Sequence, residues 1–336
     1  MFNTPNVKFQ PHGNLTLVTE ENIVSLEGAH KTQGMCGAHT AILTKKQLEQ
    51  RFPWLNTNGL GGGCLGLEGE GWFDTWNMLQ SIILRNKYLG VDYIHGEVMY
   101  VKRHAIHKVE GDDYRPFETH VFIPNSKKVY PIEFSKLVVA AAGQSGNIGR
   151  MAGIGQGKGP LYMDIPVEPR RGYIFEIKCS GGPGLNSPLI SDPSGLFIRR
   201  NGLIGHYLVG KLPDPEEPPI PENMFGDVDP EYFEETILPL LQYRIPGFSD
   251  YTLIDSRPVD FDLNYFDGTP IVGLHPILDN IFMATGFNGR GPTYGPAVGR
   301  GIAELLLDDG YQTIDFSRFS FDRFLNKVEL KEEIYA

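Results

Sequence analysis

Three absences limit what this sequence can encode. No apolar run approaches the roughly 18 residues that a membrane helix needs, and the densest stretches, KLVVAAAG and LQSIIL, are far shorter. The three cysteines, Cys36, Cys64 and Cys179, have no paired spacing, so they form no metal motif and suggest a reducing compartment or no role. No dense Lys/Arg tract offsets the net charge of −11, which disfavours nucleic acid as a partner.

What the chain does have is enough apolar sequence for a large core. With 336 residues, 41% of them hydrophobic, we expect a globular protein divided into two lobes. Its first residues, MFNTPNVKFQPHG, match neither an apolar signal peptide nor an Arg/Ser-rich transit peptide. The sequence itself therefore indicates no cellular address.

One segment, residues 280–307, combines a strand, a glycine-rich turn and a helix. IFMAT predicts a buried strand, and the small residues after it predict a helix whose first turn lies near Pro296. The turn between them contains Gly286, Gly289 and Gly291. This order brings free backbone N–H groups and the positive helix end together, where they can hold an anion or an electron-rich ligand edge.

Two other glycine clusters imitate a dinucleotide-binding loop. Gly61, Gly63 and Gly66 satisfy G-x-G-x-x-G, but no strand precedes them and the next helix starts late, near Asp74, so we interpret this segment as a connecting loop. The second cluster, GQSGNIG at 143–149, has the wrong spacing and no complete βαβ unit after it.

The remaining pattern predicts a mixed fold. Thr44 and Gln47 fit a capping box, and Asp74 is expected to cap a helix that runs to Gly90. KLVVAAAG is typical of a parallel strand buried on both faces. From residue 166 onward, alternating β-rich segments predict a mostly antiparallel sheet. A proline-rich acidic stretch at 213–230 reads as a surface loop, with a partner contact as the alternative.

The string IFMATGFNGRGP resembles the flavin-contacting motif ATGFSGHG of the FAD-dependent amino-acid and sarcosine oxidase superfamily. LGVDYIHGEV, KLVVAAAGQSGNI, IPVEPRRGYIFEIKC and QTIDFSRFSFDRF resemble, in order, segments of one of its subfamilies. That subfamily comprises mitochondrial flavoproteins associated with assembly of respiratory complex I. The resemblance covers nearly the whole chain.

The resemblance implies an α/β (α+β) fold with two interleaved lobes. A discontinuous, glutathione-reductase-type FAD-binding lobe would comprise residues 1–100, 136–165 and 270–336. Residues 101–135 would form a β excursion. Residues 166–269 would form the substrate lobe, whose mostly antiparallel sheet roofs the flavin.

FAD is the cofactor that the resemblance implies, and it assigns contacts to two turns. Arg290 would hold the anionic flavin or a substrate carboxylate, and Asn288 would donate to a flavin oxygen; both depart from the Ser and His that are usual in the family. A surface position is the alternative for Arg290. The implied cofactor-binding residues are Val98, Ala142, Gly143, Gly146, Gly286, Asn288, Gly289, Arg290 and Gly291.

A further departure concerns the start of the chain. The family's first βαβ unit, with its pyrophosphate loop and ribose-binding acid, has no counterpart in this sequence. We therefore expect an FAD-binding lobe that is incomplete at its N-terminus, in a truncated form that has also lost its mitochondrial targeting peptide. One alternative is that such a chain does not bind FAD.

The implied function is oxidation of a small amine or amino-acid-like substrate, in which a C–H next to nitrogen gives a hydride to the flavin. Arg199 and Arg290 are the candidate clamps for a substrate carboxylate. His275 and Tyr265 are candidate contacts at the flavin face, with structural roles as the alternatives. The other functional hypothesis is a non-catalytic mitochondrial assembly factor that binds complex I subunits or assembly intermediates.

Overall fold

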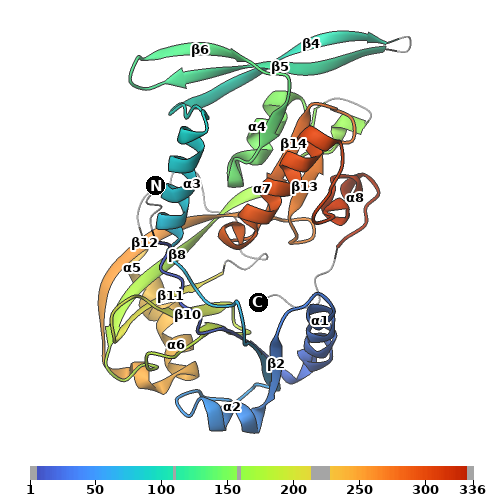
Figure 1. The fold of residues 1–336 in the computed structure, drawn as a ribbon. Coiled ribbons are helices and arrows are strands. Elements are labelled where there is room, and N and C mark those ends of the chain that lie inside the picture. Colours follow the sequence, from blue (N-terminus) through green and yellow to red (C-terminus); the bar gives the residue numbers. More distant parts are fainter. Residues whose placement is uncertain (1–5, 109–110, 157–159, 213–227, 331–336) are drawn as a thin grey trace.

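The computed structural model describes residues 6–108, 111–156, 160–212 and 228–330, and these form three sheets with helices packed on them (Figure 1). The largest sheet has eight strands, and all its strand pairs are antiparallel except the pair β1 and β9. In order of pairing, its strands are β12 (Tyr251–Asn264), β8 (Val167–Cys179), β11 (His206–Lys211), β10 (Leu196–Arg200), β9 (Leu189–Ser191), β1 (Asn14–Val18), β3 (Gly62–Gly66) and β2 (Thr40–Thr44). The predicted mixed fold with a large, mostly antiparallel sheet is confirmed.

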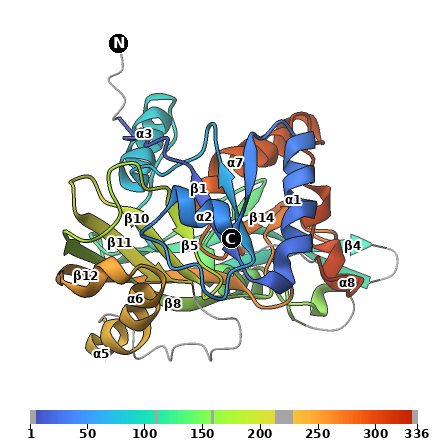
Figure 2. The same ribbon diagram turned by 90° about the horizontal axis from the view of Figure 1, so that it is seen from below.

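The main hydrophobic core lies between one face of this sheet and short helices. Phe175 and Ile177 of β8 pack in one buried cluster with Phe233, Ile237 and Leu241. The helices over this face, seen beside β8 and β12 in Figure 2, are α5 (Pro230–Tyr232), a π-helical segment (Phe233–Ile237) and α6 (Leu238–Arg244), with α2 (Lys45–Arg51) towards β2. Alternate residues of the same strands point to the opposite face.

A smaller sheet carries the glycine turn. Its strands are β13 (Ile271–Leu274), β14 (Ile281–Thr285) and β7 (Leu137–Val139). β7 runs parallel to β14, as KLVVAAAG predicts, but Val138 is exposed, so burial on both faces is not observed. Its helices are α7 (Gly291–Asp308), α4 (Ser145–Ala152) and α8 (Asp322–Leu325), with 3₁₀ turns at Ala142–Gln144 and Ser317–Phe319.

The third sheet is a meander that projects at one end of the molecule (Figure 1). It consists of β4 (Glu97–Lys108), β5 (Gly111–Ile123) and β6 (Lys128–Glu133). α3 (Thr75–Tyr88) leads into it and begins at the predicted cap, since Asp74 accepts the N–H of Asn77 at 3.0 Å. The predicted capping box of α2 is also present. α1 (Ile23–Met35) packs on β1 and β3.

The connecting loop predicted for the segment with Gly61, Gly63 and Gly66 is wrong for Gly62–Gly66, which form the buried strand β3 between β1 and β2. A Cβ on Gly62 would lie 2.8 Å from the carbonyl oxygen of Leu43, and one on Gly63 would lie 2.9 Å from that of Thr16. The glycines of this strand therefore allow the backbones of neighbouring strands to lie close together, and they do not form a turn.

The lobe boundaries remain a prediction. The strands within residues 14–66 were assigned to the FAD-binding lobe, whereas they pair into the eight-stranded sheet. The three-stranded sheet of β4, β5 and β6 spans Glu97 to Glu133, and the predicted excursion at 101–135 stays a prediction. Among the described residues, no helix is both long and apolar enough to cross a membrane, and most of the acidic loop at 213–230 lies outside them.

Candidate functional site

The glycine turn has the predicted order of strand, turn and helix. β14 ends at Thr285, Gly286 and Gly289 have φ angles of 75° and 85°, and α7 begins at Gly291. Asn288 also has a positive φ, 51°, which asparagine tolerates better than most residues. The helix begins several residues before the predicted position because Pro292 is accommodated in its first turn.

The backbone amides of this turn face a buried carboxylate from β12. Asp262 Oδ2 accepts the N–H of Phe287 at 2.9 Å, and the carbonyl oxygen of Asp262 accepts the N–H of Asn288 at 3.2 Å. Burial raises the pKa of Asp262, while the amides around Gly286 and Gly289 oppose that shift. Sequence reasoning missed this residue, because Asp262 lies 25 residues before Phe287 and no local pattern indicates the contact.

Replacing Asp262 with alanine is expected to lower the free energy of unfolding by about 1–3 kcal/mol, because buried amides of the turn lose their acceptor. Urea denaturation measures the change. Asp255 is the matched control on the same strand: it forms an exposed ion pair with Arg257, and its alanine variant should change stability by less than about 1 kcal/mol. Equal effects at both positions would contradict a specific role for Asp262.

The side chain of Asn288 links the glycine turn to the end of β12 by hydrogen bonds. Its Oδ1 accepts the N–H of Asn264 at 2.9 Å, and its Nδ2 donates to the carbonyl oxygen of Gly268. Asn264 in turn donates to Asp267 at 2.7 Å. These contacts hold the turn in place, and a direct bond from Asn288 to flavin stays a prediction.

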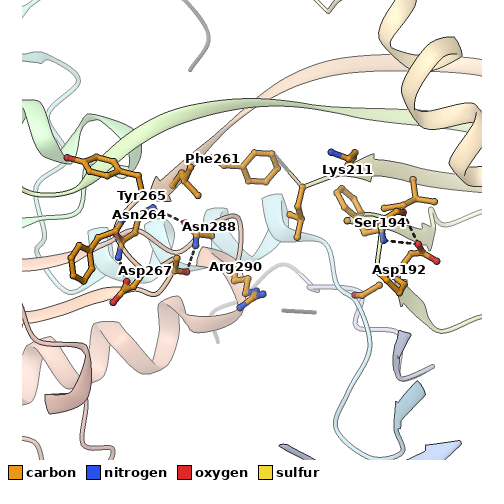
Figure 3. A pocket seen from close by; sticks show the side chains of 18 residues that line it. Asp192, Ser194, Lys211, Phe261, Asn264, Tyr265, Asp267, Asn288 and Arg290 are labelled. Carbon is orange, nitrogen blue, oxygen red and sulfur yellow. Dashed lines mark hydrogen bonds between the residues drawn. The ribbon is translucent and has the colours of Figure 1, made fainter. Parts of the chain in front are cut away.

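A cavity of about 480 Å³ lies beside the turn (Figure 3). It runs from the loop at 264–268 past Phe261 to the end of β11 and the β9–β10 hairpin. Its polar wall includes three of the predicted site residues, Arg290, Tyr265 and Asn288. The other lining residues include Phe197, Lys211, Leu212 and Asn264.

The sheet face next to the cavity is flattened by two glycines. A Cβ on Gly210 would lie 2.5 Å from the ring of Phe197, and a Cβ on Gly172 would lie 2.5 Å from the ring of Phe261. Both aromatic rings therefore lie directly over the backbone of neighbouring strands. The result is an apolar floor that suits a planar ring system.

Arg199 lies on the same face, two residues along β10 from Phe197. Its Cζ atom is 4.9 Å from the centroid of the Trp72 ring, and its Nη1 donates to the carbonyl oxygen of Arg200 at 2.9 Å. Burial lowers the pKa of Arg199, and Arg199 forms no ion pair with any other residue that the structure describes. A guanidinium in this setting is suited to bind an anionic ligand.

The second predicted contact region lies at the end of β7. Ala142 has a φ of 48° and its carbonyl oxygen accepts the hydroxyl of Thr285 at 3.2 Å, which joins this turn to the end of β14. A Cβ on Gly143 would lie 2.7 Å from Pro169, so the turn lies directly on β8. Gly146 follows, buried in α4, and Val98 lies on β4 opposite Val121.

The two residues predicted at the flavin face, Tyr265 and His275, lie in different parts of the structure. Tyr265 is 55% exposed and lines the cavity. His275 is buried in the turn between β13 and β14, where its Nδ1 accepts the N–H groups of Ile277 and Leu278 at 3.2 and 3.1 Å. This geometry supports the structural alternative for His275, and its proposed flavin contact stays a prediction.

The sequence profile described as FAD dependent oxidoreductase matches residues 3–305 of the chain. The chain belongs to this family. FAD is therefore its cofactor, as predicted. It is also 39% identical to FAD-dependent oxidoreductase domain-containing protein 1 of Xenopus laevis, over 97% of this chain and 66% of that protein. The chain spans about two thirds of the length of the curated relatives it matches.

Solved structures of other proteins share the fold. L-proline dehydrogenase from P. horikoshii superimposes with a TM-score of 0.75 and 17% identity, covering 96% of this chain and 79% of that one. Glycine oxidase from Geobacillus kaustophilus gives a TM-score of 0.70 and 16% identity, covering 95% and 76%. At these identities the likeness concerns the fold alone.

Proposed function

We propose that the chain is the catalytic part of an FAD-dependent oxidoreductase that oxidises the CH–NH bond of a carboxylate-bearing amine. Arg199 carries this proposal, because it is a largely buried cation without an acidic partner among the described residues, and it shares a face of β10 with Phe197, which lines the cavity. A bidentate pair with a carboxylate is the interaction that such a guanidinium forms best.

The residues around the cavity fit a flavin. Phe197 and Phe261 give the flat apolar floor, and the glycine turn leaves no side chain at Gly291, whose Cβ position has no atom within 4 Å. Arg290, at the first turn of α7, supplies positive charge at the edge of the cavity. When bound, FAD supplies the hydride acceptor.

The chain's own residues would bind and orient the substrate. Arg199 fixes the carboxylate, which limits the positions that the neighbouring C–H bond can adopt. The phenol of Tyr265 lines the cavity and offers a polar contact there. Apolar rings over the strands exclude water from the reacting region.

The test is reduction of bound flavin without oxygen. Purified chain loaded with FAD is mixed with sarcosine, an N-methyl amino acid, or with methylamine, which lacks the carboxylate, and the loss of flavin absorbance is followed. We expect reduction by sarcosine, and Arg199→Met should raise its half-saturating concentration at least about tenfold. Arg85→Met, which removes an exposed arginine stacked on Tyr88 at 5.4 Å, should leave it unchanged. No reduction by any N-methyl amino acid would contradict the proposal.

A second candidate function is that of a binding protein. The surface of α3 favours it, because no residue of this helix is buried and Trp76, Leu79 and Tyr88 are 66%, 48% and 61% exposed. Mitochondrial location and association with respiratory complex I or its assembly intermediates rest on the resemblance of the sequence, and they belong to this proposal. Co-purification of complex I subunits with the wild type, lost in Trp76→Ser/Leu79→Ser, would support it.

A further inference from the structure

Trp72 lies next to the guanidinium of Arg199 and is rigidly held. It is only 7% exposed. Its backbone exchanges two hydrogen bonds with Gln10, of 2.8 and 3.2 Å. Two residues later Asp74 begins the N-terminus of α3. These connections fix the backbone of Trp72, and the burial of its side chain limits rotation of the indole ring.

Within the residues that the structure describes, the indole of this pair has a buried donor that is not used, and the guanidinium has no acidic partner. The Nε1 of Trp72 is buried and donates to no acceptor in the described part of the chain. Buried indole N–H groups normally have a partner. The guanidinium of Arg199 donates to the carbonyl oxygen of Arg200 and has no carboxylate partner among residues 6–108, 111–156, 160–212 and 228–330. The buried indole N–H indicates a missing acceptor, and the cation beside it has no carboxylate partner in the same part of the chain.

The acids whose charge acts on Arg199 are engaged elsewhere. Asp74 pairs with Lys8 at 3.6 Å, and the carboxylate of Glu176 lies 3.3 Å from Nδ1 of His206. The negative charges of Asp74 and Glu176 raise the pKa of Arg199, but neither residue forms an ion pair with it. Arg199 is thus left for an external anion.

We propose that Trp72 is a positioning residue for Arg199, and that the pair selects substrates with a carboxylate over plain amines. The inference rests on the proposed function and assigns the specificity of its site. The ring keeps water from one face of the planar guanidinium and fixes the plane of its donors. A carboxylate then meets two donors that already lie in place, so less conformational freedom is lost on binding.

The first experiment needs no turnover. Trp54→Phe/Trp76→Phe leaves Trp72 as the single tryptophan of the chain, and its fluorescence is followed while sodium acetate, sarcosine or methylammonium chloride is added. Acetate and sarcosine should give a saturable change, methylammonium should give none, and Arg199→Met should abolish the response. A response of equal size to all three probes, or none to any, overturns the inference.

The second experiment follows flavin reduction by sarcosine in Trp72 variants. Trp72→Leu should raise the half-saturating concentration about three- to thirtyfold with little change in the limiting rate, whereas Trp72→Phe, which keeps a ring, should raise it less than about threefold. Tyr88→Leu, at the exposed Arg85 pair, is the matched control and should have no effect. A fluorescence response without flavin reduction would contradict the proposed function and support the anion site at Arg199. Flavin reduction with the same kinetics in Trp72→Leu and the wild type would support the proposed function and contradict the role of Trp72.

Discussion

Replacing Arg323 by methionine is expected to lower the free energy of unfolding by about 3–5 kcal/mol, because it leaves a buried carboxylate without its counter-ion. Asp267 has a side chain that is 1% exposed, and that of Arg323 is 6% exposed. The pair is bidentate, with Nε to Oδ2 at 2.7 Å and Nη2 to Oδ1 at 3.2 Å. Arg323 also donates to the carbonyl oxygens of Phe319, Ser320, Thr269 and Pro270.

The substitution Arg323→Met should also affect the candidate site, through Asp267. Burial raises the pKa of Asp267, but the ion pair with Arg323 and the backbone amides of Thr269 and Leu330 lower it by a larger amount. The net shift of the pKa is downward, so the carboxylate is charged at neutral pH. Asp267 also lines the cavity and accepts the Nδ2 of Asn264. Without Arg323, this charge would draw water to the cavity wall, and we expect weaker flavin retention as well as lower stability.

Urea denaturation of Arg323→Met, Asp267→Asn and the double variant separates these effects. The double variant should lose less stability than the sum of the two single variants, because the second change removes the unpaired charge created by the first. Arg257→Met is the control, since the ion pair of Arg257 is exposed and contributes less than about 1 kcal/mol. Additive losses would show that Arg323 and Asp267 act independently.

The parts of the fold that the sequence predicts well depend on near neighbours. Thr44 and Gln47 form their capping box within one helical turn, and Asp74 caps α3 in the same way. The strand, turn and helix around Gly286 also follow from consecutive residues. Each of these features is determined by side chains a few positions apart, so the pattern alone is sufficient.

What the sequence did not predict depends on contacts between distant residues. Asp262 meets Phe287 across 25 residues, and Arg323 meets Asp267 across 56. The strand Gly62–Gly66 has a composition typical of a loop, and only its neighbours on both sides make it a strand. Arg199 could be selected as a cation, but nothing near it in sequence indicates that Trp72 lies against it.

His275 makes the stability of the protein sensitive to mild acid. Burial lowers its pKa to about 4 from the usual 6.5, although Asp322 opposes the shift, and Nδ1 already accepts two backbone N–H groups. The neutral imidazole is therefore the form that fits the fold. Between pH 6.5 and about 4 the unfolded chain binds a proton that the folded chain does not, so stability falls with decreasing pH across that window and is unaffected by this group above it.

The expected size of this loss is about 3 kcal/mol, from a shift of roughly 2.5 pKa units at about 1.36 kcal/mol each. His275→Gln should be less stable at neutral pH, because the glutamine does not reproduce the contact with Phe321, yet its stability should fall by about 3 kcal/mol less between pH 6.5 and 4. His39→Gln is the control, since it removes an exposed histidine from another part of the fold. Urea midpoints measured at half-unit steps of pH decide the matter: parallel curves for His275→Gln and the wild type would mean that the imidazole is protonated without cost, and that the bonds to Ile277 and Leu278 do not hold this turn.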